Sequence, residues 1–153
     1  VAILTHFSGP KNRAKMTDPI SDSSPVVESW DQYWQGIVEA EAYSTGGVSH
    51  PAISAFWEQF FQAVEANFIS PAIIDIGTGS GAVVERALSV FGNSGAEITC
   101  IDVSDAAIAS IRSRFPGVHG LVTDARSIPL DSGEFQIVTS QFGNFSITPC
   151  IQA

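Results

Sequence analysis

The sequence predicts an α/β fold, and three observations support this prediction. A short β-branched run, Ala72–Ile74, leads through a glycine-rich loop into a helical pattern that starts near Ala82. Two further strand patterns follow, and each is followed by or ends in an acidic residue, Asp102 and Asp124. Helical patterns separate these strands, and such alternation is typical of α/β proteins with a parallel sheet.

Length and composition indicate one soluble globular domain. The chain has 153 residues, of which 44% are hydrophobic and 15% charged, which is enough for a core. No apolar run is long enough to span a membrane and the first residues lack a secretion signal, so we expect a cytoplasmic protein. The net charge of −9 should repel phosphate backbones and anionic membranes, which favours a small-molecule partner over nucleic acid. Cys100 and Cys150 lack metal-like or redox spacing and are expected to be reduced packing residues.

The first part of the chain divides into a leader and a helical segment. Residues 1–25 show no sustained period and end in a Ser/Pro/Asp cluster, which predicts a disordered leader. Met16 is the sole methionine, and we hypothesise that translation begins there. Residues 26–70 carry two amphipathic helical patterns, from Val26 to Ala40 and from about Pro51 to Phe68. Their aromatic residues are expected mainly in the core.

The loop after the first β-branched run has the marks of a ligand site. The stretch Pro71–Gly81 reads PAIIDIGTGSG, with Gly77, Gly79 and Gly81 at alternate positions. Glycines there let the backbone turn sharply and let a ligand lie against bare main chain, although a simple turn is the alternative. The dinucleotide-binding pattern G-x-G-x-x-G would need a glycine where Ala82 stands, so the spacing favours another nucleotide-type ligand.

The next strand supplies a candidate ribose-binding residue. A helix is predicted from Ala82 to Phe91, ended by Gly92 in the manner of a C-terminal cap, and a strand at Glu97–Ile101 then leads into Asp102. A carboxylate offers two acceptors to a ribose diol. Asp102 could instead cap the following helix, but Ser104 is better placed for that role. We therefore predict that Asp102 binds ribose.

The remaining elements bring more polar residues to the same edge. A helix is predicted at Ala106–Phe115, and strands at Val118–Thr123 and Phe135–Thr139. Open α/β sheets bind ligands at the carboxyl ends of their strands. The residues that leave the last strand at that end, and that should line the ligand, are Ser140, Gln141 and Phe142.

The string IIDIGTGSG resembles the first motif of class I S-adenosylmethionine-dependent methyltransferases, an acidic residue followed by G-x-G-x-G. The resemblance covers about Pro71–Gly143 and implies a Rossmann-like, doubly wound, mostly parallel sheet with S-adenosyl-L-methionine across its carboxyl ends. Gln136 departs from the family pattern, which has Asp there, but should lie far from the ligand. Only NFSITPCIQA follows Gly143, so we expect a sheet truncated after its fourth strand and a chain that is a fragment.

The resemblance also implies a set of cofactor-binding residues. Asp75 would shape the loop and face the methionine end, with a cap of the following turn as the alternative role. Asp124 and the amide of Ala125 would contact the adenine, and a surface loop carboxylate is the alternative for Asp124. Tyr33 and Trp34 would be candidates for a lid. The full set is Asp75, Gly77, Thr78, Gly79, Gly81, Asp102, Val103, Asp124, Ala125, Ser140, Gln141 and Phe142.

The expected activity is methyl transfer from S-adenosyl-L-methionine to a small-molecule acceptor of unknown identity. No catalytic base is assigned, and no metal is expected, because His6, His50 and His119 form no triad or metal cluster in the sequence. Two alternatives stay open. One is a non-catalytic nucleotide-binding or interaction module, and the other is an NAD(P)-dependent oxidoreductase domain, which the glycine spacing and Asp75 disfavour.

Overall fold

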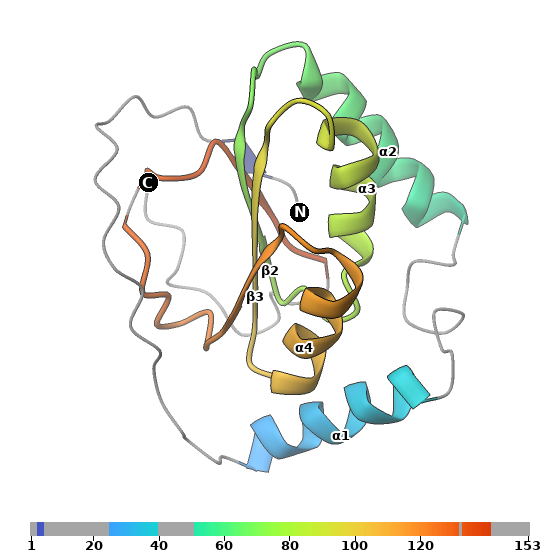
Figure 1. Ribbon diagram of the computed structural model, residues 1–153, viewed down its shortest axis with the longest axis vertical. Coiled ribbons are helices and arrows are strands. Elements are labelled where there is room, and N and C mark those ends of the chain that lie inside the picture. Colours follow the sequence, from blue (N-terminus) through green and yellow to red (C-terminus); the bar gives the residue numbers. More distant parts are fainter. Residues whose placement is uncertain (1–2, 5–24, 40–50, 132, 142–153) are drawn as a thin grey trace.

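The computed structural model describes residues 3–4, 25–39, 51–131 and 133–141. Helices and strands alternate through most of this part, as the sequence predicts (Figure 1). In chain order the elements are β1 (Ile3–Leu4), α1 (Pro25–Glu39), α2 (Pro51–Glu65), β2 (Ala72–Ile76), α3 (Ala82–Phe91), β3 (Glu97–Asp102), α4 (Asp105–Arg114), β4 (His119–Val122) and β5 (Ile137–Thr139).

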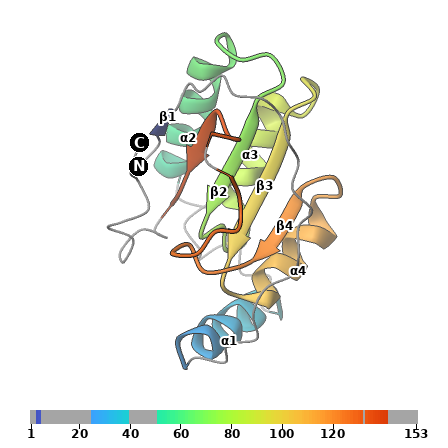
Figure 2. The same cartoon turned by 90° about the vertical axis from the view of Figure 1, so that its left-hand side faces the viewer.

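The sheet has the strand order β1-β5-β2-β3-β4. Strands β2 to β5 run parallel, in the order 3-2-1-4 when these four are numbered along the chain, so the predicted α/β fold with a mostly parallel sheet is confirmed. The chain moves outward from β2 to β3 and β4, and then returns to place β5 on the other side of β2 (Figure 2). The order therefore reverses between β2 and β5, and ligands of open α/β sheets bind at such a point.

One short strand lies within the segment expected to be a disordered leader. Ile3 and Leu4 pair antiparallel with Val138 and Ile137, which covers the outer edge of β5. Pairing of this edge satisfies backbone groups that the strand would otherwise leave free. The rest of the expected leader up to Ser24, including Met16, lies outside the described residues.

Element boundaries differ from the sequence predictions by a few residues. Helix α2 ends at Glu65 rather than near Phe68, because the amides of Asn67 and Phe68 donate to Val64 and Glu65 in a turn. Helix α3 ends at Phe91 as expected, but its capping glycine has right-handed dihedral angles. Strand β5 is shorter than predicted and starts after Gln136.

Gln136 lies at the amino end of the sheet, as predicted. Its side-chain Oε1 accepts a hydrogen bond of 2.7 Å from the amide of Ala72, the first residue of β2. Its own amide donates to the carbonyl of Ala72 at 2.9 Å. The amide side chain therefore joins β5 to β2 at the end of the sheet opposite the glycine loop.

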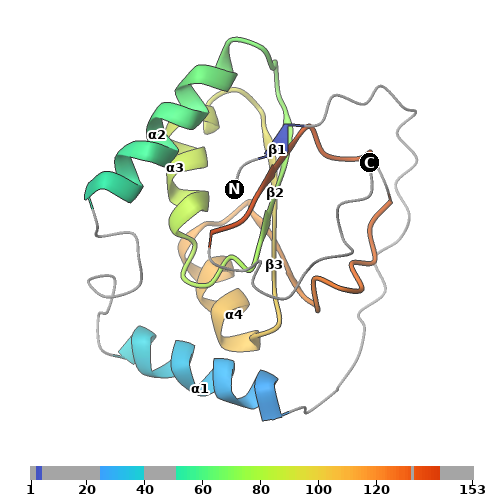
Figure 3. The same ribbon diagram turned by 180° about the vertical axis from the view of Figure 1, so that it is seen from behind.

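The two faces of the sheet are covered differently. Helices α2, α3 and α4 lie together on one face (Figures 1 and 3), where the main core includes Phe61, Phe91, Ile73, Ile98, Ile111 and Ile137. On the other face Ile74, Ile101 and Leu121 pack against residues of the connection between β4 and β5, namely Ala125, Ile128, Leu130 and Phe135. Helix α1 lies apart from both layers and contacts α4 near the carboxyl ends of the strands (Figure 3).

Candidate functional site

The loop between β2 and α3, residues 77–81, forms the corner at the carboxyl edge of the sheet, and we call it the glycine corner. Gly77, Gly79 and Gly81 have φ values of 66°, 50° and 82°, a region that side chains rarely adopt. The amides of Gly77 and Thr78 donate to the carbonyl of Ile101 at 2.9 and 3.1 Å. The alternate glycines thus produce the predicted sharp turn and tie it to the end of β3.

Two glycines of the corner are approached closely by protein side chains. A Cβ on Gly81 would lie 2.3 Å from Ile111 Cδ1 of α4, so this glycine allows α4 to pack against the corner. A Cβ on Gly79 would overlap the indole ring of Trp34 from α1. The lid candidate Trp34 therefore lies on the corner, whereas the other candidate, Tyr33, is 46% exposed.

Asp102 joins the glycine corner to the start of α4. Its carboxylate is buried, with Oδ2 accepting from the amide of Gly79 at 2.9 Å and Oδ1 from the amide of Ser104 at 3.0 Å. Burial raises the pKa of Asp102, and the backbone donors oppose this rise. Ser104 caps α4 as predicted, because its Oγ accepts from the amide of Ala107 at 3.2 Å.

Asp75 lies beneath the corner, within the layer between sheet and helices. Its Oδ1 accepts a hydrogen bond of 2.8 Å from Thr139 Oγ1, which links β2 to β5. Burial raises the pKa of Asp75 to about 7. The nearby hydroxyl of Thr78 favours the ionised carboxylate of Asp75 and so opposes this rise in pKa. Among the described residues, however, the Thr78 hydroxyl has no partner at hydrogen-bond geometry. The hydrogen bond to Thr139 therefore gives Asp75 a contact with β5 in addition to any role in the loop.

Asp124 lies at the same edge of the sheet as Asp102. Val122 pairs with Asp102, and the amide of Thr123 donates to the carbonyl of Asp102 at 2.8 Å. Asp124 follows directly, so both carboxylates leave the carboxyl ends of neighbouring strands. This arrangement agrees with the edge expected from the sequence.

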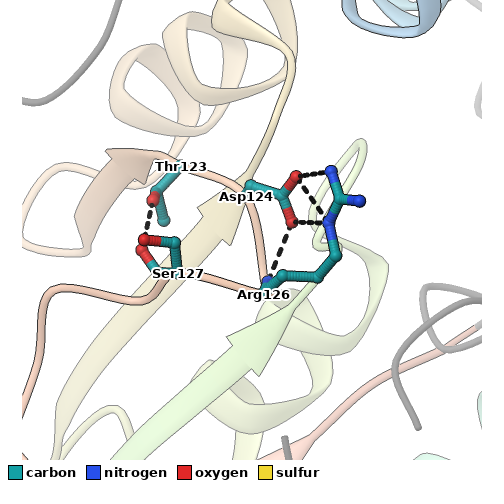
Figure 4. A network of polar contacts seen from close by, with 4 residues as sticks. All are labelled: Thr123, Asp124, Arg126 and Ser127. Carbon is teal, nitrogen blue, oxygen red and sulfur yellow. Dashed lines mark hydrogen bonds and ion pairs between the residues drawn. The ribbon is translucent and has the colours of Figure 1, made fainter. Parts of the chain in front are cut away.

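The Asp124 carboxylate is held by Arg126 in a tight turn (Figure 4). Arg126 Nε lies 3.0 Å from each carboxylate oxygen, and the amide of Arg126 donates to Oδ1 at 2.8 Å. These bonds with Arg126 lower the pKa of Asp124. Thr123 Oγ1 closes the turn by donating to the carbonyl of Ser127 at 3.2 Å. The sequence analysis did not identify Arg126, although its position two residues after an aspartate in a turn is a usable signal.

The residues at the end of β5 point to different neighbours. Ser140 Oγ donates to the carbonyl of Ile76 at 2.8 Å and joins the carboxyl ends of β5 and β2. Gln141 Oε1 accepts from the indole Nε1 of Trp57 at 2.5 Å, so this side chain reaches toward α2. Phe142 lies outside the described residues. Val103 and Ala125, each directly after a carboxylate, are half-buried.

Two contacts at this edge were missed by the sequence analysis. Arg114 Nη1 donates to the carbonyl of Ser80 at 2.6 Å and supports the corner from the end of α4. Asp31 of α1 accepts from Ser104 Oγ at 2.5 Å and from the amide of Ala106 at 3.2 Å. Asp31 and Ser104 are 73 residues apart, and no local pattern links them.

In the described ranges no cluster of three or more His, Cys, Asp or Glu side chains could hold a metal ion. None of the helices that the structure describes is both long and apolar enough to cross a membrane. Cys100 is a buried free thiol, as expected for a packing residue, and burial raises its pKa. Cys150 lies outside the described residues.

Comparison with known proteins identifies the class to which this fold and edge belong. Residues 73–152, more than half of the chain, match the family described as "Methyltransferase domain". The chain belongs to this family of class I S-adenosylmethionine-dependent methyltransferase domains. The resemblance inferred from IIDIGTGSG is thereby confirmed, and members of this family use S-adenosyl-L-methionine.

Individual relatives are longer than this chain. A demethylmenaquinone methyltransferase of Chlorobaculum tepidum is 33% identical over 73 residues, which make up 48% of this chain and 29% of that protein. A Methanococcus maripaludis structure, provisionally assigned as an S-adenosyl-L-methionine-dependent methyltransferase, has a TM-score of 0.55 at 16% identity. The match covers 86% of this chain and 56% of that protein. A plantazolicin methyltransferase solved with a pentazolic desmethylPZN analog and SAH has a TM-score of 0.50 at 21% identity, with coverage of 70% and 41%. The matched part therefore spans between 29% and 56% of the length of these proteins.

Proposed function

We propose that this chain forms the cofactor-binding part of an S-adenosyl-L-methionine-dependent methyltransferase that acts on a small molecule. The observation that carries the proposal is the hydrogen bond of 2.9 Å between Gly79 and Asp102. It joins the glycine corner to a carboxylate at the end of the next strand, beside the point where the strand order reverses. A ligand at this edge would meet bare main chain and a diol-binding acceptor together.

The residues at the edge fit the ribose of an adenosyl ligand. Each oxygen of the Asp102 carboxylate accepts one backbone N–H. A carboxylate oxygen has a second lone pair, so both oxygens can still accept a bond from a ribose hydroxyl. Gly79 has no Cβ beside this carboxylate, and the indole of Trp34 fills the space there, so a ligand would have to displace the indole. We therefore assign ribose binding to Asp102, with Val103 next to it.

For the adenine we propose Asp124 and the amide of Ala125. The Asp124 carboxylate would accept from the adenine amino group, in competition with Arg126. The Arg126 side chain is 71% exposed, and exposed ion pairs contribute only about 0–1 kcal/mol, so Arg126 can give way at small cost. The adenine amino group would then replace one of the hydrogen bonds that Arg126 donates to Asp124.

The methionine end would lie over the glycine corner and the end of β5. The residues proposed there are Asp75, Gly77, Thr78, Gly81, Ser140, Gln141 and Phe142. When bound, S-adenosyl-L-methionine supplies a sulfonium methyl group that an acceptor nucleophile can displace. The chain's own residues hold and align the ligand, and alignment of reactants can be worth ~7–11 kcal/mol. We assign no general base.

A small-molecule acceptor fits the charge of the chain. A net charge of −9 opposes binding to a phosphate backbone. The relatives above are named for demethylmenaquinone and plantazolicin rather than for a nucleic acid. These names support an acceptor of low molecular mass without specifying one.

Ligand-dependent thermal unfolding tests the proposal and separates it from the alternatives. We expect SAH and S-adenosyl-L-methionine to raise Tm, because a ligand at 100 times its Kd stabilises the folded state by about 2.7 kcal/mol. NAD+ and NADP+ should leave Tm unchanged. The variant Asp102→Asn should lose most of the shift, whereas Asp131→Asn, at an exposed position, should keep it.

Other outcomes would favour other functions. A shift with NAD+ but not with SAH would support the oxidoreductase alternative, and no shift with any of these ligands would contradict the proposal. Binding of SAH without methyl transfer to any tested acceptor would favour the non-catalytic binding module.

A further inference from the structure

We propose that Asp31 is a positioning residue that latches α1 onto the start of α4 and thereby holds Trp34 on the glycine corner. The latch consists of two hydrogen bonds to one carboxylate oxygen. Asp31 Oδ1 accepts from Ser104 Oγ at 2.5 Å and from the amide of Ala106 at 3.2 Å. Ser104 is fully buried, so the contact lies at an interface within the fold rather than on an exposed surface.

The two contacts of α1 with the site come from the same side of the helix. Asp31 and Trp34 are three residues apart, and residues at this spacing lie on one face of a helix. Asp31 reaches the start of α4, and Trp34 reaches Gly79. Trp30 and Tyr33 are 47% and 46% exposed, and Tyr33 packs edge-on against Trp34 with 5.0 Å between ring centroids. The hydrogen bonds of Asp31 therefore fix α1 by the same face that carries Trp34.

Both contact points of α1 converge on Asp102. The carboxylate of Asp102 accepts from the amide of Ser104, whose hydroxyl donates to Asp31. It also accepts a hydrogen bond from the amide of Gly79, the glycine against which the indole of Trp34 packs. A displacement of α1 would thus disturb the two residues that hold this carboxylate in place. Asp31 also places a second negative charge near Asp102, which adds to the raised pKa of Asp102.

The energetics favour a latch that can open. A hydrogen bond to a charged group contributes about 1.5–3 kcal/mol, and a carboxylate is favoured near a helix N-terminus by ~0.3–1 kcal/mol. These values are small beside the free energy that holds a folded core, so α1 can detach while the sheet stays intact.

The consequence for ligand binding rests on the proposed function. A ligand that lies against Gly79 would take the place that the indole of Trp34 holds, so α1 must move before the ligand can enter. Loss of the latch should then speed ligand entry. Asp31 would act on the site through Ser104 and Trp34, without touching the ligand itself.

Hydrogen exchange of the whole chain tests the latch independently of any ligand. In Asp31→Ala we expect faster exchange across α1 and at the amide of Ala106, with β2 and β3 unchanged. Asp31→Asn keeps an acceptor oxygen and should restore most of the protection. Gln32→Ala alters an exposed side chain within the same helix and should behave as the unaltered chain. Thermal unfolding of each variant shows whether the rest of the fold is retained.

Stopped-flow binding of SAH tests the positioning role. We expect Asp31→Ala to raise the association rate about tenfold, with a smaller change in the dissociation rate, because the two hydrogen bonds that hold α1 in place are together worth at least this factor. Asp31→Asn should lie close to the unaltered chain, and Gln32→Ala should match it.

The results of these experiments test the latch, the positioning role and the proposed function separately. Unchanged exchange in α1 of Asp31→Ala would overturn the latch. Faster exchange in α1 with an unchanged SAH association rate would overturn the positioning role. If the unaltered chain did not bind SAH, the proposed function would fail, while the hydrogen exchange of α1 would still decide whether Asp31 holds Trp34 on the corner.

Discussion

Asp75 places a carboxylate in the apolar layer between the sheet and its helices. Thr139 Oγ1 lies 2.8 Å from Asp75 Oδ1 and 3.3 Å from the carbonyl of Ile74, but a hydroxyl has one proton. If Asp75 is protonated, it can donate to Thr139 while Thr139 donates to Ile74, and both contacts are satisfied. This geometry agrees with a pKa that burial raises to about 7. Below about pH 7 the neutral form of Asp75 is therefore favoured in the folded chain.

This raised pKa predicts how stability depends on pH. The folded-state pKa of about 7 exceeds the unfolded value near 3.8, so the folded state holds the proton more strongly. The stabilising contribution of Asp75 to the free energy of unfolding is fully present below about pH 4 and is lost as pH rises through 7. Asp75→Asn mimics the neutral form, and we expect it to be more stable than the unaltered chain at pH 8, by on the order of 2–4 kcal/mol, with little difference at pH 4.

Urea unfolding at pH 4, 6 and 8 measures this difference. Asp131→Asn removes an exposed carboxylate and serves as the control, with the same pH dependence as the unaltered chain. A constant difference between Asp75→Asn and the unaltered chain at all three pH values would show that Asp75 does not titrate in this range.

Local chemistry explains which residues could be predicted from the sequence. The cap at Ser104 and the alternate glycines act through neighbours in the chain, so their spacing is enough to identify them. Asp31 and Gln141 bind partners 73 and 84 residues away, and such contacts depend on the packed fold. Asp102 was expected to be free once Ser104 capped the helix, yet it also accepts two backbone amides.

At the scale of elements, the helices and strands follow from hydrophobic periodicity, which is a local property. The ends of these elements were less predictable. A turn at Asn67 ends α2, and the side chain of Gln136 bonds to β2 just before β5 begins. The position of α1 could not be derived from its own amphipathic pattern. Two aromatic residues of that pattern, Trp30 and Tyr33, are about half exposed rather than in the core as expected, whereas Trp34 reaches the glycine corner.

The contact between α1 and the corner predicts a coupling between Gly79 and Trp34. Gly79→Ala would add a Cβ at φ +50° and overlap the indole, so we expect a loss of about 1–3 kcal/mol in the free energy of unfolding. In a Trp34→Ala background the same change should cost less, because only the backbone strain remains.

A double-mutant cycle by urea unfolding measures this coupling. Residues in contact typically show interaction energies of about 0.5–3 kcal/mol. An interaction energy near zero would mean that the indole of Trp34 does not lie on Gly79 in solution.

For the whole molecule, strand order matters more than any single motif. The parallel neighbours β2, β3 and β4 bring the glycine corner, Asp102 and Asp124 to one edge of the sheet, and the order reverses beside the corner, between β2 and β5. The sequence predicted this edge because strands that alternate with helices run parallel, so their carboxyl ends meet. How the second face is covered was not predicted. Residues of the connection between β4 and β5 pack there against Ile74, Ile101 and Leu121.

The central claim is that this edge binds one adenosyl ligand through the corner and both carboxylates. Titration of the isotope-labelled chain with SAH, followed by amide chemical shifts, tests it most directly. We predict that the amides of Gly79, Val103 and Ala125 shift together with a single Kd, and that Asp102→Asn raises this Kd at least about tenfold, as expected when a charged acceptor is lost. Shifts confined to other surfaces, separate Kd values for the corner and Ala125, or no shifts at all would contradict the account.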